Sequence, residues 1–192
     1  MKEAKVLLFD IDNTKVDDSL FSREDKKQLE QYKNEKVRRE KTLSLYVKRK
    51  YVGDYYLNES GKPLSSDKYF NISHKNQYLV FIMDEIPVGI DIEHIKPVKE
   101  ALVKYIASEE EKAYIKDELS FYEVWTNKEA ITKANGKGIK QKVDTIPSLP
   151  INSIHTFEGK KYCNRTITFN DYVITVSREK DEDYRLVIEE IK

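Results

Sequence analysis

The sequence contains a single cysteine, Cys163, and no apolar run that approaches the length of a membrane span. One cysteine cannot form an intrachain disulfide, so the fold has to depend on an apolar core, and 192 residues are enough to bury one. The N-terminus also lacks the basic start and apolar segment of a secretory signal. We therefore expect a cytoplasmic protein that has no membrane partner.

Net charge is also missing, because 34 aspartates and glutamates balance 34 lysines and arginines. A neutral chain produces no long-range field toward nucleic acid or a membrane surface. Local excesses remain, since basic residues crowd 23–50 and 96–142 while acidic residues gather at 108–118 and 179–190. The composition therefore argues against a nucleic-acid partner but allows local basic surfaces.

Sequence repeats, low-complexity tracts and linkers rich in glycine and serine are absent as well. Any division near residues 90–97 would therefore lie between tightly packed halves. In the first half, apolar positions three to four residues apart predict one long basic helix. It would begin after Ser22, an N-cap with Asp25 three residues later, and end at Gly53.

A second helix pattern precedes the sheet-like C-terminal third. Ser108 with Glu111 predicts a capping box, and residues 121–134 predict a helix that Gly136 stops. Short apolar or alternating segments predict strands at 6–10, 70–72, 78–83, 88–92, 162–169, 172–177 and 185–191. We expect an α+β fold whose last third is mostly antiparallel sheet.

Two carboxylates, Asp91 and Glu93, are two positions apart on one of these strands and so project from the same face. Hard oxygen ligands of this kind suit Mg²⁺, which usually takes one or two carboxylates and completes its shell with phosphates and water. Taken alone, the spacing is more typical of an ordinary half-buried strand.

A second set lies on the predicted helix, where Trp125, Glu129 and Lys133 follow at four-residue intervals on one face. Glu129 is suited to complete a metal site or accept a proton, and Lys133 to neutralise a phosphate leaving group. The structural alternative is an ordinary glutamate-to-lysine ion pair on an exposed helix face.

A third set is suited to bind an anion. Lys62 stands between the turn-forming residues Gly61 and Pro63, and Ser73 and His74 follow a short strand. Lysine offers a compact charge to phosphate, while serine and histidine offer directional hydrogen bonds. A lone histidine in this position is otherwise more often structural.

Together these sets resemble the signature blocks of Sfp-type 4′-phosphopantetheinyl transferases. The blocks appear in order as Gly61-Lys62-Pro63, Asn71-Ile72-Ser73-His74, Val88-Gly89-Ile90-Asp91-Ile92-Glu93 and Trp125-Thr126-Asn127-Lys128-Glu129-Ala130 with Lys133. The resemblance implies a monomer of two similar α+β halves related by a pseudo-twofold axis, with coenzyme A and Mg²⁺ between them. We place the halves at residues 1–90 and 91–192.

The resemblance also assigns roles to individual residues. It implies Mg²⁺ on Asp91, Glu93 and Glu129, coenzyme A contacts from Arg39, Lys62, Ser73, His74 and Lys133, and catalysis by Glu129, Lys133 and Glu111. Whether Glu129 or Glu111 is the general base stays open. One departure is Lys75, which stands where the family often has a second serine.

The activity implied is that of a holo-[acyl-carrier-protein] synthase. The phosphopantetheine arm of coenzyme A would move onto a serine of an acyl or peptidyl carrier protein, with release of 3′,5′-ADP. Such carriers are acidic helical domains, so charge complementarity suggests contacts with basic residues near Lys112, Lys116, Lys137 and Lys140.

Two other functions compete with this one. Residues 9–14 copy the nucleophile loop of haloacid-dehalogenase-type phosphatases, with Asp10 and Asp12 as the reacting pair, but those enzymes use parallel βαβ units. An RNA-binding module could use the basic helix at 23–50, although zero net charge and the lack of a nucleic-acid motif make a solvated helix face the simpler explanation.

Overall fold

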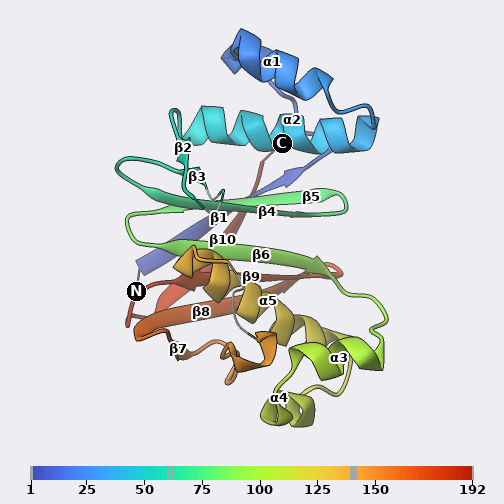
Figure 1. The fold of residues 1–192 in the computed structure, drawn as a ribbon, viewed down its shortest axis with the longest axis vertical. Helices are drawn as coiled ribbons and strands as arrows, with labels where there is room; N and C mark the ends of the chain where they lie inside the picture. The colour runs from blue at the N-terminus through green and yellow to red at the C-terminus, as the bar shows by residue number, and fades with distance from the viewer. Residues whose placement is uncertain (1, 60, 62, 139–141, 192) are drawn as a thin grey trace.

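The computed structural model describes residues 2–59, 61, 63–138 and 142–191, and Figure 1 shows their arrangement. The strands are β1 (Lys2–Asp10), β2 (Tyr56–Leu57), β3 (Pro63–Leu64), β4 (Tyr69–Lys75), β5 (Tyr78–Asp84), β6 (Val88–His94), β7 (Ile154–Phe157), β8 (Lys160–Phe169), β9 (Tyr172–Arg178) and β10 (Tyr184–Ile191). The α-helices are α1 (Arg23–Glu30), α2 (Glu35–Tyr51), α3 (Glu100–Ile106), α4 (Glu109–Tyr114) and α5 (Glu118–Asn135).

Two four-stranded sheets form the centre of the molecule. Their strand orders are β10-β1-β5-β4 and β6-β9-β8-β7. The runs β1-β5-β4 and β6-β9-β8 correspond. In each run the middle strand comes last in the chain and pairs antiparallel with both of the others. A long helix, α2 or α5, follows the first strand of each run. The α+β fold of two similar halves is therefore confirmed.

The layers follow in the order helix, sheet, sheet and helix, as Figure 1 shows. Apolar side chains such as Val6, Ile90 and Ile174 fill the space between the sheets. Leu43 and Val47 of α2 pack with aromatic residues of the first sheet, and α5 closes the outer side of the second. None of the described helices has both the length and the apolar character needed to cross a membrane.

The predicted long basic helix is two helices. Its start is as predicted, because Ser22 and Asp25 form a capping box at α1. The prediction of one continuous helix to Gly53 is wrong, since α1 ends at Glu30 and Asn34 caps the new helix α2 by accepting from the Val37 N–H. The apolar periodicity continues across the break and therefore hid it from the sequence pattern.

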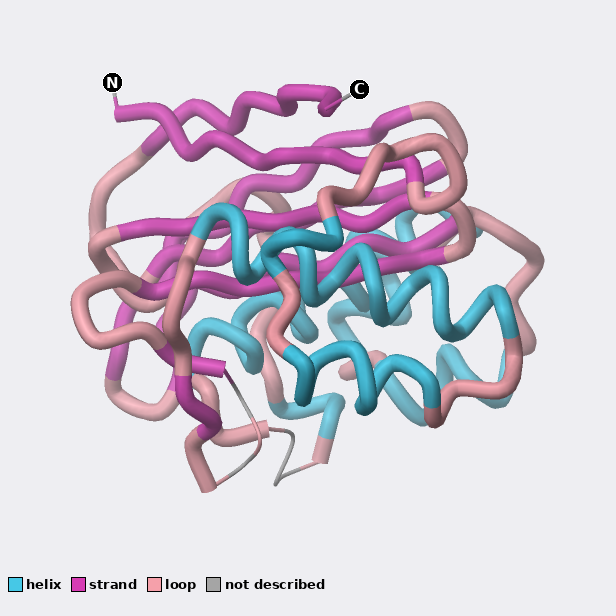
Figure 2. Tube along the Cα trace, turned by 90° about the horizontal axis from the view of Figure 1, so that it is seen from above, coloured by secondary structure: helices cyan, strands magenta, loops and turns pink. Residues whose placement is uncertain are grey.

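The C-terminal strands divide between the two sheets. Strands β8 and β9 form the predicted antiparallel arrangement, and β7, which was not predicted, pairs antiparallel with β8. The last strand, β10, instead runs parallel to β1 in the first sheet, so the first and last strands lie side by side in Figure 2 with the two termini at opposite ends of the pair. The division into 1–90 and 91–192 stays a prediction; β6 runs across it, and β10 joins the sheet of the first half.

Candidate active site

The edge strands β4 and β6 are joined by side chains from alternate positions of β4. Alternate residues of a strand share a face, so positions 71, 73 and 75 all point toward β6. The Asn71 Oδ1 accepts from the Ile90 N–H at 2.9 Å, the Ser73 Oγ donates to the Asp91 Oδ1 at 3.0 Å, and the Lys75 Nζ contacts the Glu93 Oε2 at 2.6 Å. The predicted anion-binding and metal-binding blocks therefore meet where the two sheets adjoin.

Helix α5 approaches β6 very closely at Gly89. A Cβ at this position would lie 2.1 Å from the Ala130 carbonyl oxygen and 2.4 Å from the Ala134 nitrogen, so only glycine fits beneath the helix backbone. This approach brings Lys133 onto the site, where its Nζ contacts the Asp91 Oδ1 at 2.6 Å and donates to the Ser73 Oγ at 3.1 Å. Lys133 is thus part of the site and not only of the helix surface.

The three predicted metal ligands influence one another electrostatically. Burial, and the neighbouring charge of Glu93, raise the pKa of Asp91 against the opposing effect of Lys133. Burial, and then the charges of Asp91 and Glu93, raise the pKa of Glu129. We refer to Asp91, Glu93 and Glu129 together as the acidic group.

The donor chemistry of this acidic group fits a hard divalent cation. The Asp91 Oδ2 is buried and has no hydrogen-bond partner, which leaves a carboxylate oxygen able to bind a cation. Among the described residues, however, no three histidine, cysteine, aspartate or glutamate side chains are arranged so that they could together hold a metal ion. Lys133 and Lys75 instead hold Asp91 and Glu93 individually.

His74 lies on the opposite face of β4 from Ser73 and Lys75. The His74 Nε2 lies 3.2 Å from the Glu40 Oε1 of α2. Burial lowers the pKa of His74, and nearby Lys41, Lys133 and Lys75 lower it further although Glu40 opposes them. His74 is therefore a neutral hydrogen-bonding group at neutral pH, surrounded by three lysines that could receive phosphate oxygens.

Of the residues expected to contact coenzyme A, Arg39 is engaged within the fold. The Arg39 Nε donates to the Ile11 carbonyl oxygen at 2.6 Å, and its Nη2 donates to the Thr14 carbonyl oxygen. Arg39 thus holds the loop after β1 against α2. Lys62 lies outside the described residues, as does Lys140.

Glu111 forms a buried ion pair with Lys128, a residue that the sequence analysis did not single out. The Glu111 Oε2 lies 2.8 Å from the Lys128 Nζ and accepts from the Ser108 N–H at 2.7 Å, which confirms the predicted capping box. Its Oε1 accepts from the Ser148 hydroxyl at 2.5 Å. Both oxygens of Glu111 are thus bound within a structural contact among α4, α5 and the segment around Ser148. A signal was available, because Lys128 lies on the apolar stripe with Val124.

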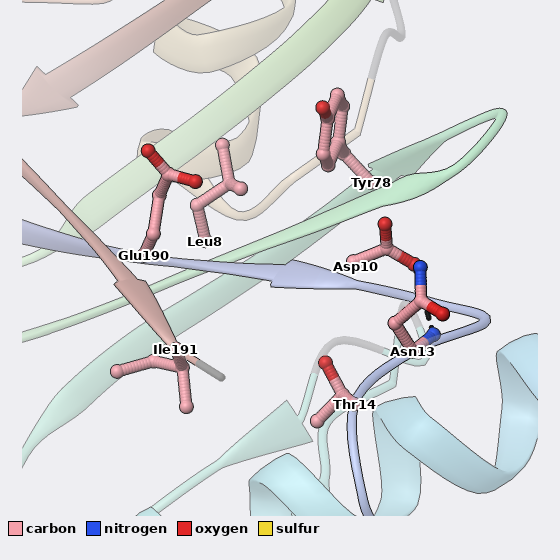
Figure 3. A pocket seen from close by; sticks show the side chains of 7 residues that line it. All are labelled: Leu8, Asp10, Asn13, Thr14, Tyr78, Glu190 and Ile191. Atoms are coloured by element: carbon pink, nitrogen blue, oxygen red, sulfur yellow. Dashed lines mark hydrogen bonds between the residues drawn. The ribbon is translucent and has the colours of Figure 1, made fainter.

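The aspartates of the phosphatase alternative form a turn. The Asp10 Oδ1 accepts from the Asp12 and Asn13 backbone N–H groups at 3.0 and 2.9 Å, as Figure 3 shows in part. Asp10 also borders a cavity of about 250 Å³ with Thr14 and Glu190. Its strand lies between antiparallel β5 and parallel β10 in a mixed sheet, so the sheet of parallel βαβ units used by those phosphatases is not supported.

Comparison with known proteins agrees with the motif blocks. A family model described as the 4′-phosphopantetheinyl transferase superfamily matches residues 87–188. The 4′-phosphopantetheinyl transferase gsp of Aneurinibacillus migulanus is 37% identical over 103 residues, which cover 50% of this chain and 40% of that protein. The 4′-phosphopantetheinyl transferase Sfp of Bacillus subtilis (strain 168) is 36% identical over 97 residues, covering 46% and 43%.

Among solved structures, the holo-[acyl-carrier-protein] synthase AcpS of Thermotoga maritima matches 50% of this chain and 64% of its own, with a TM-score of 0.39 and 16% identity. The matched part of the chain spans less than half of the length of the gsp and Sfp proteins. The match of the family model covers more than half of this chain and includes Asp91, Glu93, Glu129 and Lys133. On that match, the chain belongs to the 4′-phosphopantetheinyl transferase superfamily, and the resemblance to Sfp-type members is confirmed.

Proposed function

We propose that the protein transfers the 4′-phosphopantetheine arm of coenzyme A onto a serine of an acyl or peptidyl carrier protein and releases 3′,5′-ADP. The observation that carries this proposal is the contact of Lys133 with both Asp91 and Ser73. It brings the motif blocks of β4, β6 and α5 into one site that combines carboxylates with lysines. Such a site suits a reaction that moves a phosphate ester.

The lysines provide the anion-binding part of the site. Lys133 and Lys41 lie near neutral His74, so the phosphates of coenzyme A would enter a positively charged surface. Lys133 would then stabilise the charge that develops on 3′,5′-ADP as it departs. Arg39 stays a predicted contact for the coenzyme and would have to leave the carbonyl oxygens of Ile11 and Thr14 to make it.

The carboxylates provide the cation-binding part. Asp91, Glu93 and Glu129 would hold Mg²⁺, for which the unpartnered Asp91 Oδ2 is a suitable oxygen. When bound, the ion would neutralise the coenzyme pyrophosphate and orient it.

Glu129 is the better supported general base. Its carboxylate is part of the acidic group at the site, and in the ion-free protein its pKa is raised by burial and by Asp91. Glu111 has both oxygens bound to Ser108, Lys128 and Ser148, which leaves it poorly placed to take a proton. We therefore assign removal of the proton from the carrier serine to Glu129, directly or through a water molecule.

The carrier, the monomeric state and the cytoplasmic location are parts of the same proposal. An acidic carrier would have to compete for some of the lysines named above, because Lys112 contacts Glu109 at 2.6 Å and Lys137 contacts Glu158 at 2.7 Å. Such exposed pairs are weak, so exchange of partners costs little.

The test is intact-mass analysis of apo carrier proteins incubated with coenzyme A, Mg²⁺ and this protein. We expect a gain of one phosphopantetheine mass that requires Mg²⁺ and is lost in Glu129→Gln. Glu118→Gln, an exposed change in the first turn of the same helix, is the matched control and should retain transfer. No mass gain across acyl and peptidyl carriers would contradict the proposed activity.

A further inference from the structure

Lys75 is the third of the β4 side chains that reach β6, and it contacts a predicted metal ligand. Its position is fixed by strand geometry, because Ser73, two residues earlier on the same face, already contacts Asp91. The Lys75 Nζ lies 2.6 Å from the Glu93 Oε2, and the two side chains are 31% and 17% exposed. The pair is therefore only partly screened by water and is stronger than a typical surface ion pair.

The contact of Lys75 differs from that of Lys133. Lys133 contacts one oxygen of Asp91, while the other, Oδ2, is buried without a hydrogen bond. Asp91 therefore has one oxygen left for a cation while Lys133 holds the other. An ammonium and a divalent cation repel each other, however, so a cation that binds the Glu93 Oε2 has to displace Lys75.

We propose that Lys75 is an internal counter-ion that competes with the divalent cation for Glu93 and so sets the cation affinity of the site. This inference rests on the proposed function, because it takes Glu93 to be a ligand. In the cation-free protein the ammonium of Lys75 balances part of the acidic group formed by Asp91, Glu93 and Glu129. Cation binding replaces this charge and releases Lys75 to solvent or to a substrate phosphate.

The decisive variant is Lys75→Ser. It removes the competitor and leaves the acidic group more negative, and both changes favour cation binding. Lys75→Arg retains the positive charge and should behave like the parent protein. Lys160→Ser is the matched control, since Lys160 pairs with Glu179 at 2.9 Å near the opposite end of the sheet strands from Glu93.

Manganese binding, followed by electron paramagnetic resonance on protein without coenzyme A, measures the effect directly. For Lys75→Ser we expect a dissociation constant for Mn²⁺ about three- to tenfold below that of the parent, in keeping with one partly exposed ion pair. The rise in melting temperature on adding Mg²⁺ should also be larger in this variant. Combining Lys75→Ser with Glu93→Gln should abolish the gain in Mn²⁺ affinity.

Unchanged or weaker Mn²⁺ binding by Lys75→Ser would overturn the inference, as would an equal gain in the control Lys160→Ser. These results differ from failure of the proposed function. A parent protein that binds Mn²⁺ and transfers phosphopantetheine, with no gain in Mn²⁺ affinity in Lys75→Ser, refutes the role of Lys75 alone. A parent protein that neither binds the ion nor modifies any carrier refutes both.

Discussion

Gly89 of β6 lies directly against the backbone of α5, where a Cβ would stand 2.1 Å from the Ala130 carbonyl oxygen. Backbone cannot move aside as a flexible side chain can, so we expect Gly89→Ala to shift α5 and to destabilise the protein by about 1–3 kcal/mol or more. The shift should also move Glu129 of α5 away from Asp91 and Glu93 and so weaken Mn²⁺ binding. Urea denaturation and ion binding check both effects, and an unaltered unfolding midpoint would show that the helix has more room than the structure gives it.

Glu129→Gln should separate stability from activity. The raised pKa of Glu129 reflects burial of the carboxylate and repulsion by Asp91 and Glu93, so removing its charge relieves an unfavourable interaction. We expect stability at neutral pH to stay the same or rise by up to about 1 kcal/mol while transfer is lost. The measurement pairs thermal unfolding with carrier modification; a marked fall in melting temperature would contradict this account of Glu129.

Glu111→Gln should have the opposite profile. It leaves the buried ammonium of Lys128 without its carboxylate, and breaking one partner of a buried ion pair costs roughly 3–5 kcal/mol. Because the Glu111 oxygens are bound within the fold, transfer per folded molecule should fall much less than in Glu129→Gln. Single-turnover rates corrected for the folded fraction measure this, and a loss equal to that of Glu129→Gln would restore Glu111 as the base.

His155 should make the fold sensitive to acid. It is buried, and burial lowers its pKa from the usual value near 6.5 to about 4 although nearby Glu111 opposes the shift. The unfolded chain therefore binds a proton that the folded chain does not between these pH values, so stability is present above 6.5 and is lost as the pH falls toward 4. One pKa unit corresponds to about 1.4 kcal/mol, which makes the full effect roughly 3 kcal/mol.

The comparison for His155 is the free energy of unfolding at pH 7.5 and pH 4.5 in the parent and in His155→Gln. Carboxylates titrate in both proteins, so the difference between their acid losses isolates the histidine. Equal losses on acidification would mean that His155 is protonated in the folded protein.

The helix ends could be predicted from the local sequence, whereas the long-range pairing of strands could not. Ser22, Ser108 and Gly136 act on backbone groups within a few residues, so their roles follow from neighbouring letters of the sequence. The break before Asn34 was not predicted, because the apolar periodicity of the sequence continues through it. An alternating strand such as β10 does not specify its partner, so its pairing with β1 required the structure.

The site was predictable to the same extent. Spacing placed Asp91 with Glu93 on one strand face and Glu129 with Lys133 on one helix face, and the motif order joined the two sets. It did not reveal that Lys75 holds Glu93, because that contact depends on two edge strands meeting. Nor did it reveal that Glu111 is bound by Lys128.

The pairing of β1 with β10 has a consequence for synthesis on the ribosome. Translation produces β1 long before its parallel neighbour, which comprises residues 184–191. Contacts of such sequence separation form slowly, and an unpaired strand edge is open to pairing with other chains. While the chain emerges, β1 has β5 on one side and an exposed edge on the other. The edge of β1 therefore waits for its second partner until residues 184–191 have been made, and nascent chains should be most prone to aggregation in that interval.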